Sequence, residues 1–190
     1  TGYDMYLFSK KENKKFLKKL VYKILTRATL KFSDRYSVSS NSDMSFLKSN
    51  FNSEIKAYLL HNWVEIFEVG KVSDRENTII SVGRLEYQKN YEFIIKELSN
   101  SILELQIVGE GSRKDELINL AKKYNTNLQI IQRIDNKELT TKLMNTKVFV
   151  LSSHFEGNPK VLLEAMAAGC IVFASNIKNH SEIIEEGING

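Results

Sequence analysis

Five short, continuous apolar runs alternate with helical segments from residue 79 onward, and this alternation is the strongest constraint on the fold. The runs are Ile79 to Val82, Leu105 to Val108, Leu128 to Ile131, Val148 to Leu151 and Ile171 to Ala174. Such runs are typical of strands that are buried on both faces of a parallel sheet. Strict alternation with helices predicts right-handed crossovers and an α/β fold with a doubly wound parallel sheet.

The segments between these runs carry apolar residues at helical spacing, together with signals for helix ends. Asp135 and Glu138 form a capping-box pattern. Pro159 suits a first helical turn, and Gly169 suits a helix end. Helices are therefore expected over residues 90–98, 112–124, 135–145 and 161–168.

Polar and glycine residues follow several of the expected strands. In a doubly wound sheet, a ligand lies beyond the carboxyl ends of the strands. The residues placed at that edge by their position after a strand are Arg84, Gly109, Arg133 and Glu156. The topology alone therefore predicts that these residues converge.

Glu156 and Glu164 stand eight positions apart, across a Gly-Asn-Pro turn and the opening of a helix. A helix N-terminus at the edge of a parallel sheet attracts anions, and two nearby carboxylates suit a ligand that combines phosphate with sugar hydroxyls. The alternative is an ordinary crossover with solvated glutamates. The spacing alone does not separate the two interpretations.

Four segments resemble, in order, the motifs of family 4 glycosyltransferases, which are retaining nucleotide-sugar transferases of the GT-B fold. EGNPKVLLEAMAAG (156–169) is similar to the paired-glutamate donor motif of that family. SVGRLEYQKN (81–90) resembles its Gly-Arg-Leu…Lys-Asn segment, and IVGEGSRKDEL (107–117) resembles its strand followed by Gly-x-Gly. HSEIIEEGING (180–190) is similar to its terminal element, with Ser181 in place of a proline.

The resemblance implies a role for each matching residue. Arg84 and Lys89 would face the donor diphosphate and stabilise the leaving phosphate, Glu164 would bind the ribose hydroxyls, and Glu156 would lie by the transferred sugar. Arg84, Lys89 and Glu156 are thus the catalytic candidates. Main-chain contacts to the donor are expected at Gly83, Gly109, Gly111, Arg133, Ile134, Gly157, Asn158, Pro159, Lys160 and Val161.

The implied activity is retaining transfer of a hexose-type sugar from a UDP- or GDP-type donor to a glycan or lipid-linked acceptor in cell-surface polysaccharide synthesis. No cofactor besides the donor substrate is implied, and the site is expected to work without a metal. Two alternatives remain: a nucleotide-sugar-binding module without activity, and a GT-B sugar-nucleotide epimerase.

Residues 1–70 resemble the closing part of the N-terminal, acceptor-binding domain of a GT-B enzyme. A helix is expected over 12–32, a strand over 36–39, a helix over 43–51 and a strand over 55–60. Trp63 stands where the family has a glycine, and residues 69–77 are the expected linker. Residues 71–190 then form most of the donor-binding domain. We expect such a fragment to bind nucleotide diphosphate weakly and to transfer no sugar.

The helix over 12–32 has an apolar half and a lysine-rich half. It either packs on the rest of its domain with a solvated basic face or attaches to an anionic membrane surface. A net charge of +4 is too small an excess for a nucleic-acid binder. The single Cys170 agrees with a reducing compartment, and no apolar run approaches the ~18 residues of a membrane span. The sequence therefore predicts a cytoplasmic chain, either free or at the inner face of the membrane.

Overall fold

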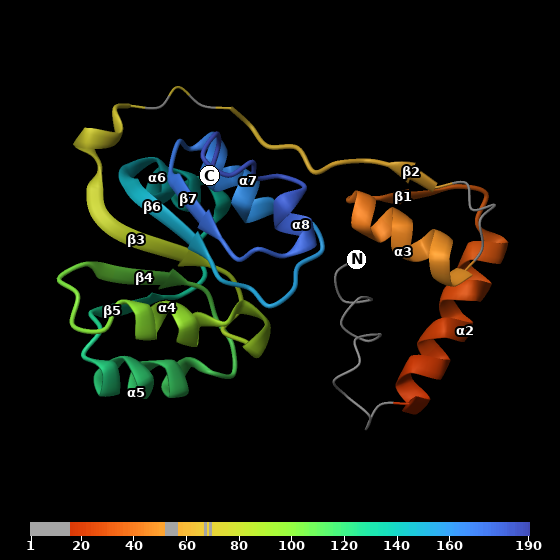
Figure 1. The fold of residues 1–190 in the computed structure, drawn as a ribbon, viewed down its shortest axis with the longest axis horizontal. Coiled ribbons are helices and arrows are strands. Elements are labelled where there is room, and N and C mark those ends of the chain that lie inside the picture. Colours follow the sequence, from red (N-terminus) through yellow and green to blue (C-terminus); the bar gives the residue numbers. More distant parts are fainter. Residues whose placement is uncertain (1–15, 52–56, 67, 69) are drawn as a thin grey trace. The chain divides into compact units, whose positions relative to one another are not determined.

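The computed structural model describes residues 16–51, 57–66, 68 and 70–190, and these residues form two compact units (Figure 1). The first unit contains the described residues up to Asn62, together with Phe155–Asn158. The second contains Trp63–His154 and Pro159–Gly190. The boundary predicted after residue 70 lies in the stretch from Trp63 to Arg75, whose described residues form no helix or strand apart from the 3-10 turn Val72–Asp74.

The second unit is built on a five-stranded sheet in which every neighbouring pair of strands is parallel. Its strand order is β5-β4-β3-β6-β7. The strands are β3 (Glu76–Val82), β4 (Glu104–Val108), β5 (Leu128–Ile131), β6 (Thr146–Leu151) and β7 (Ile171–Ala174). The predicted doubly wound parallel sheet is confirmed, and each predicted strand forms.

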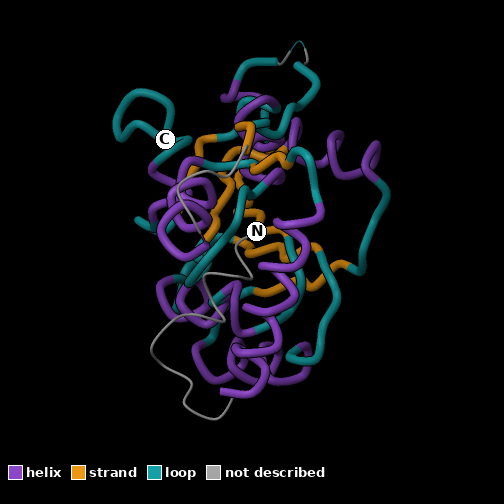
Figure 2. The backbone as a smooth tube through the Cα atoms, turned by 90° about the vertical axis from the view of Figure 1, so that its right-hand side faces the viewer, coloured by secondary structure: helices purple, strands orange, loops and turns teal. Residues whose placement is uncertain are grey.

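Helices cover both faces of this sheet, and Figure 2 colours the helices, strands and loops separately. The helices are α4 (Tyr91–Glu97), α5 (Lys114–Tyr124), α6 (Asn136–Asn145), α7 (Lys160–Ala167) and the short α8 (Lys178–Ser181). Neighbouring strand residues enter different cores, because successive side chains point to opposite faces. Ile79 packs with residues of α4 and α5, whereas Ile80 packs with residues of α6 and α7.

Several predicted boundaries were wrong by one or a few residues. β3 begins at Glu76, inside the predicted linker, because Glu76 pairs with Thr146 of β6 and pairing does not require apolar side chains. Pro159 is the N-cap of α7 rather than a residue of its first turn, with φ −74° and ψ 93°. The prediction that every strand is buried on both faces was also wrong, since β7 is an edge strand and exposes Ile171 and Phe173.

The ends of α6 and α7 follow the predicted signals. The Asp135 side chain accepts a hydrogen bond from the Glu138 N–H at 2.8 Å. Gly169 adopts φ 73° just after α7 and donates to the carbonyl of Met166, while the next N–H, that of Cys170, donates to Ala165. These two bonds form a Schellman motif, which ends a helix by satisfying its last carbonyls.

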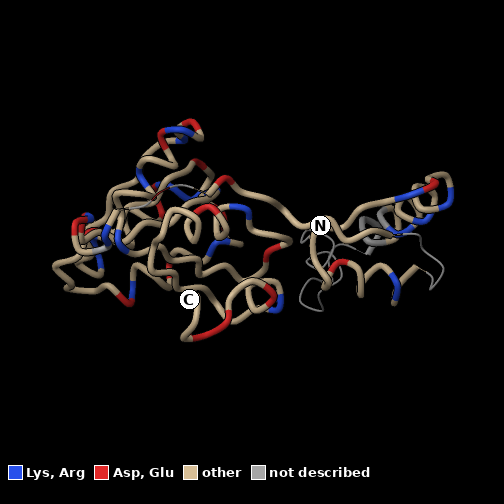
Figure 3. The backbone as a smooth tube through the Cα atoms, turned by 90° about the horizontal axis from the view of Figure 1, so that it is seen from above, with Lys and Arg blue, Asp and Glu red and all other residues tan. Residues whose placement is uncertain are grey.

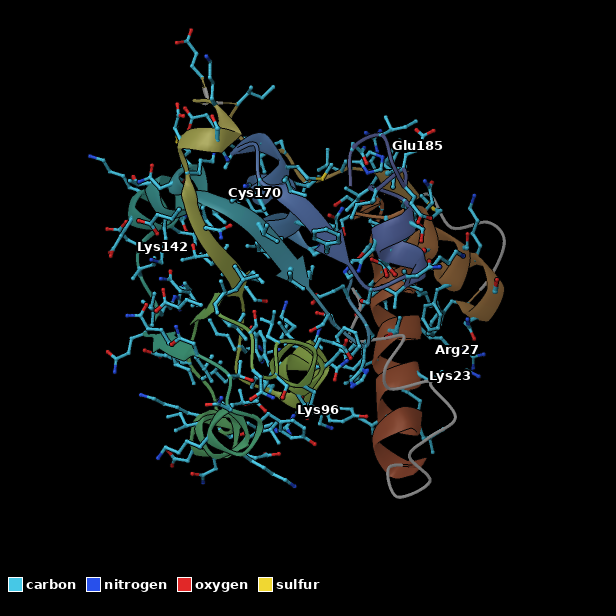
Figure 4. The ribbon with its side chains drawn as sticks, turned by 60° about the vertical axis from the view of Figure 1, so that its left-hand side comes forward. Lys23, Arg27, Lys96, Lys142, Cys170 and Glu185 are labelled. Atoms are coloured by element: carbon cyan, nitrogen blue, oxygen red, sulfur yellow. The ribbon has the colours of Figure 1, made fainter. Side chains whose placement is uncertain are left out.

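Cys170 is half-buried where the chain enters β7 (Figure 4). Its thiol lies 3.2 Å from the carbonyl oxygen of Leu143 and 3.6 Å from that of Thr146. Burial raises the pKa of the Cys170 thiol to about 11, and the nearby Arg75 acts in the opposite direction. The thiol is therefore protonated at neutral pH.

The first unit contains α2 (Phe16–Phe32), β1 (Tyr36–Val38), α3 (Asn41–Phe51) and β2 (Ala57–Leu59). β1 and β2 pair in parallel. α3 begins two residues earlier than predicted because the Ser40 hydroxyl accepts from the Asp43 N–H and caps its first turn. The predicted residues 12–15 of the first helix and 55–56 of the second strand lie outside the described residues.

The charged residues of α2 are all basic (Figure 3), and Lys23 and Arg27 lie one turn apart on it (Figure 4). Its apolar residues Leu20, Val21, Ile24 and Leu25 are all exposed, between 44% and 61%. Packing of this apolar side, one of the two interpretations of the helix, is thus not observed within the described residues. No helix of the described part is long and apolar enough to cross a membrane.

Candidate functional site

The candidate site lies at the point where the strand order of the second unit reverses. The chain runs from β3 outward through β4 to β5, and then returns to the other side of β3 as β6. In an open doubly wound sheet, the crevice for a ligand lies outside the carboxyl ends of the two strands at this point. Arg84 and Lys89 follow β3, so the chain places these two candidates just beyond that strand, whereas Glu156, which comes after β6 in the chain, groups with the first unit.

The segments that follow β3, β4 and β5 continue the hydrogen bonding of the sheet beyond its strands. Gly83 N–H donates to Val108, and Leu85 N–H donates to Glu110. In the opposite direction, Arg113 N–H donates to the Leu85 carbonyl at 3.1 Å, while Gly109 N–H donates to Ile131. The Gly83–Leu85 segment and the Gly109–Arg113 segment therefore form one backbone unit rather than two independent loops.

Glycine is required where these segments touch. Gly83 has φ 151° and Gly109 has φ 156°, a conformation that residues with a side chain rarely adopt. A Cβ atom on Gly109 would collide with the carbonyl oxygen of Gly83, and one on Gly111 would lie 2.5 Å from the carbonyl oxygen of Leu85. Gly109 and Gly111 thus allow a close approach to the segment that carries Arg84, and their predicted main-chain contacts to the donor stay a prediction.

Lys89 lies across the backbone at the end of β3. A Cβ atom built on Gly83 would lie 2.5 Å from Cε of Lys89 and 3.0 Å from its Nζ. The ammonium group therefore lies beside Gly83, at the carboxyl end of the strand. Arg84, the next residue in the chain, is exposed. The structure thus brings Lys89 to the segment of Gly83 and Arg84, while the role of the two cations at a diphosphate stays a prediction.

The segments after β3 and β6 are also bonded to each other. The Ser152 hydroxyl lies 2.9 Å from the carbonyl oxygens of both Lys89 and Asn90. The Asn90 side-chain amide donates to the Ser152 carbonyl at 3.2 Å, and His154 N–H donates to the carbonyl of Gln88 at 2.8 Å. Sequence reasoning missed Ser152 and Asn90. Two signals for Asn90 were its place in the matched Lys-Asn pair and the tolerance of asparagine for the left-handed conformation, which Asn90 adopts with φ 50°.

Ion pairs and hydrogen bonds hold the Gly-x-Gly segment against α4 and α5. Glu86 accepts from the backbone N–H and the hydroxyl of Ser112, both at 3.2 Å. Arg113 lies 2.6 Å from a carboxylate oxygen of Glu92 on α4 and 2.5 Å from one of Glu116 on α5. The bond to Glu116, with help from Glu92, raises the pKa of Arg113 above its usual range, and Arg113 lowers the pKa of Glu116.

α7 begins at the candidate site and carries the second glutamate. Its N-cap, Pro159, has no side-chain hydrogen bond to the helix, and Lys160 and Val161 form its first turn. Glu164 lies one turn further and is 26% exposed, with Oε1 3.2 Å from Nζ of Lys160. Lys160 therefore contributes a cation next to the Glu164 carboxylate, which sequence reasoning had not assigned to it.

The turn that carries Glu156 is hydrogen-bonded through Asn158 to other residues of the first unit. The Asn158 side-chain amide donates to the carbonyl of Ser39, and the Asn62 amide donates to the carbonyl of Asn158 at 3.0 Å. Glu156 is buried, with 8% of its surface exposed, and Gly157 is half-buried. The Asn158 carbonyl and amide thus anchor this turn, while its predicted contacts to phosphate stay a prediction.

Arg133 and Ile134 follow β5, which is the edge strand furthest from β6. Arg133 is exposed and Ile134 is half-buried against the α6 and α7 core. Both lie at the carboxyl edge of the sheet, with β4 between them and β3. The structure thus places them away from the strand reversal, at the far end of the same edge.

Within the residues that the structure describes, no group of three or more His, Cys, Asp or Glu side chains is arranged to hold a metal ion. The segment that follows β3 at the strand reversal carries two cationic side chains, those of Arg84 and Lys89. The arrangement can bind an anionic ligand at the carboxyl end of β3, beside a helix N-terminus with an adjacent carboxylate.

Comparison with known proteins identifies relatives of this chain. The family model described as glycosyl transferases group 1 matches residues 64–190. A Campylobacter jejuni enzyme, N-acetylgalactosamine-N,N'-diacetylbacillosaminyl-diphospho-undecaprenol 4-alpha-N-acetylgalactosaminyltransferase, is 29% identical over 168 residues, which are 84% of this chain and 46% of that protein. The capsular polysaccharide biosynthesis glycosyltransferase CapH of Staphylococcus aureus is 32% identical over 135 residues, 65% of this chain and 38% of CapH. The chain thus spans less than half the length of either relative.

A solved structure shares the fold. A mutant of Staphylococcus aureus TarM, in complex with Fondaparinux, alpha-GlcNAc-glycerol and UDP, matches with a TM-score of 0.77 at 23% identity. The match covers 94% of this chain and 38% of TarM. At this identity the likeness shows the fold, and it confirms the predicted Rossmann-like architecture of GT-B glycosyltransferases.

Proposed function

The chain belongs to the glycosyl transferases group 1 family, and on this premise we propose that it supplies the donor-binding part of a retaining, family 4-type glycosyltransferase. The proposed reaction moves a hexose-type sugar from a UDP- or GDP-linked donor to a glycan or lipid-linked acceptor. The product belongs to a cell-surface polysaccharide. The names of the Campylobacter and Staphylococcus relatives, which act on an undecaprenol-linked diphosphate and in capsule synthesis, support this class of acceptor.

The observation that carries the proposal is the position of Lys89 beside Gly83 at the end of β3, next to Arg84. A nucleotide-diphospho-sugar presents a diphosphate whose negative charge grows as the bond to the sugar breaks. Charge-assisted hydrogen bonds from two cations contribute about 1.5 to 3 kcal/mol each. They stabilise the transition state more than the bound donor, because the leaving phosphate carries more charge there.

The N-terminus of α7 and its glutamate suit the rest of the donor. Since Pro159 makes no side-chain cap, the first N–H groups of α7 can bind phosphate, to which the helix end adds about 0.3 to 1 kcal/mol. The Glu164 carboxylate can accept both hydrogen bonds of the ribose diol, and Lys160 holds it in place.

Glu156 is assigned to the transferred sugar, whose hydroxyls it would orient. Two carboxylates on either side of an anomeric carbon would suggest glycoside hydrolysis, but Glu164 is assigned to the ribose, which argues against that scheme. We therefore favour front-face transfer with retention, in which the leaving phosphate helps to take the proton of the acceptor.

The proposed site works without a metal because Arg84 and Lys89 supply the positive charge at the diphosphate. Nucleotide affinity should then be the same with a chelator as with added magnesium. A large gain in affinity with magnesium would show that the two cations are insufficient.

Isothermal titration of the chain with UDP and GDP at fixed salt tests the donor site. One of the two nucleoside diphosphates should bind the parent. Arg84→Ala and Lys89→Ala should each lower the affinity for it by about tenfold to a hundredfold. Lys96→Ala is the matched control, since Lys96 is an exposed cation in the last turn of α4 (Figure 4). Nucleosides without phosphate should bind the parent and the variants alike. If neither variant loses affinity for the nucleoside diphosphate, Arg84 and Lys89 are ordinary surface cations and the proposed donor site is refuted.

A further inference from the structure

Two aromatic side chains meet where the segments after β3 and β6 come together. The rings of Tyr87 and His154 lie 4.7 Å apart between centroids, with an angle of 33° between their planes. Tyr87 is 57% exposed and His154 is also exposed. An exposed pair of this kind offers an apolar surface with polar groups, the phenol hydroxyl and the imidazole nitrogens, at its edges.

The backbone holds this pair in position. His154 N–H donates to the carbonyl of Gln88, the neighbour of Tyr87, at 2.8 Å. The Ser152 hydroxyl lies 2.9 Å from the Lys89 carbonyl on the other side of the same contact. Both rings therefore lie on segments whose relative position is fixed, so a ligand that stacks on them does not have to order a loop.

The pair borders both groups assigned to the donor. Tyr87 lies two residues before Lys89, the candidate for the diphosphate, and His154 lies two residues before Glu156, the candidate for the sugar. In a nucleotide sugar, the pyranose is joined directly to the diphosphate. A pyranose ring has an apolar C–H face that packs on aromatic rings and hydroxyls at its rim that match polar edges.

We propose that Tyr87 and His154 form a stacking platform for a pyranose ring. The inference rests on the proposed function, because the ring is either the transferred sugar of the donor or a sugar of the acceptor glycan. A pyranose ring that stacks on this pair would displace water from the aromatic rings, and the pair would orient the sugar beside Lys89. Substitution of the platform residues distinguishes the two sources. A donor sugar predicts a loss of affinity for the nucleotide sugar, and an acceptor sugar predicts a loss of affinity for a free oligosaccharide.

The test is titration of the chain with UDP, with UDP-N-acetylgalactosamine, with the corresponding GDP and GDP-mannose pair, and with a free oligosaccharide of N-acetylgalactosamine. Tyr87→Ala and His154→Ala should each lower the affinity for the nucleotide sugar by about twofold to tenfold. The affinity for the nucleoside diphosphate should stay as it is in the parent. If the platform serves the acceptor, the free oligosaccharide shows the loss instead. Tyr87→Phe keeps the ring and should retain most of the affinity. Phe93→Ala, which removes an exposed aromatic ring on α4, should leave every ligand unaffected.

Failure of this inference is distinct from failure of the proposed function. A parent chain that binds neither UDP nor GDP would refute the donor site, while the free oligosaccharide would still report on the platform. Saccharide affinities that stay unchanged in Tyr87→Ala and His154→Ala, or an equal loss for nucleoside diphosphate and nucleotide sugar, would overturn the platform. Because both side chains are exposed, the variants should keep the thermal stability of the parent.

Discussion

Alanine at Gly109 should destabilise the second unit far more than alanine at Gly83, although both glycines have nearly the same φ. The backbone strain of a residue with a side chain at φ 156° costs about 1 to 3 kcal/mol. At Gly109, the new Cβ also collides with the Gly83 carbonyl oxygen, which belongs to a hydrogen-bonded backbone and cannot rotate away. Overpacking of this kind adds about 1 to 3 kcal/mol, so the total is about 2 to 6 kcal/mol.

At Gly83 the obstacle is the end of a lysine side chain. The Cβ would lie 2.5 Å from Cε of Lys89, but a lysine tail can swing aside at little cost. The stability loss should therefore stay near the strain alone, about 1 to 3 kcal/mol. The displaced ammonium should appear as a second effect, a nucleoside diphosphate affinity lowered by about tenfold or more.

Urea denaturation of the parent, Gly83→Ala and Gly109→Ala measures the first effect, with unchanged m-values as the sign of an unchanged unfolding reaction. Gly187→Ala is the matched control, since Gly187 has φ 76° and nothing within 4 Å of an added Cβ. A loss for Gly109→Ala no larger than that for Gly187→Ala would refute the close contact between the two segments. Unchanged nucleotide affinity in Gly83→Ala would refute the position of Lys89.

Three further predictions test separate parts of the molecule. Glu164→Gln should weaken nucleotide binding because an amide accepts less strongly from a diol, whereas Glu156→Gln should leave nucleotide affinity unchanged and lower sugar transfer by the whole protein; equal weakening of the free nucleotide would contradict this division. The free energy of unfolding of the parent should fall relative to that of Cys170→Ala as pH rises from about 9 to about 11. The reason is that the unfolded thiol ionises first while the folded thiol keeps its proton. A constant difference between the two proteins across that range, measured by urea titration, would disprove the raised pKa. Asp135→Ala should cost about 0.5 to 2 kcal/mol by removing the cap of α6, and Asp135→Asn should cost much less; equal losses in the same assay would exclude capping as the cause.

The fold of the second unit could be predicted because its signals are local. Each buried strand reads as an apolar run, and the end signals at Asp135 and Gly169 act within one helical turn. The errors at strand starts have a different origin. Glu76 belongs to β3 because of its partner Thr146, which is seventy residues away and is not visible in the local pattern.

The candidate site could be predicted only in part, for the same reason. The positions of Arg84 and Glu156 after strands follow from the topology, and the resemblance pointed to Lys89. The hydroxyl of Ser152 and the rings of Tyr87 and His154 gain their importance from contacts across more than sixty residues of sequence. A single serine, tyrosine or histidine in a loop carries no signal for such contacts.

The strand order explains why these distant segments act together. A chain that leaves β3 in one direction and returns beside it as β6 must bring the segments after both strands to the same edge. Proximity alone would leave two mobile loops, and a diphosphate would then have to order them at a cost in binding free energy. The Ser152 hydroxyl and the Asn90 amide instead join the segments through their backbones, and Gly83 leaves room for Lys89 beside the end of β3. The backbone that carries Lys89 is thus held in place before any ligand arrives, and such preorganisation favours the stabilisation of a developing charge.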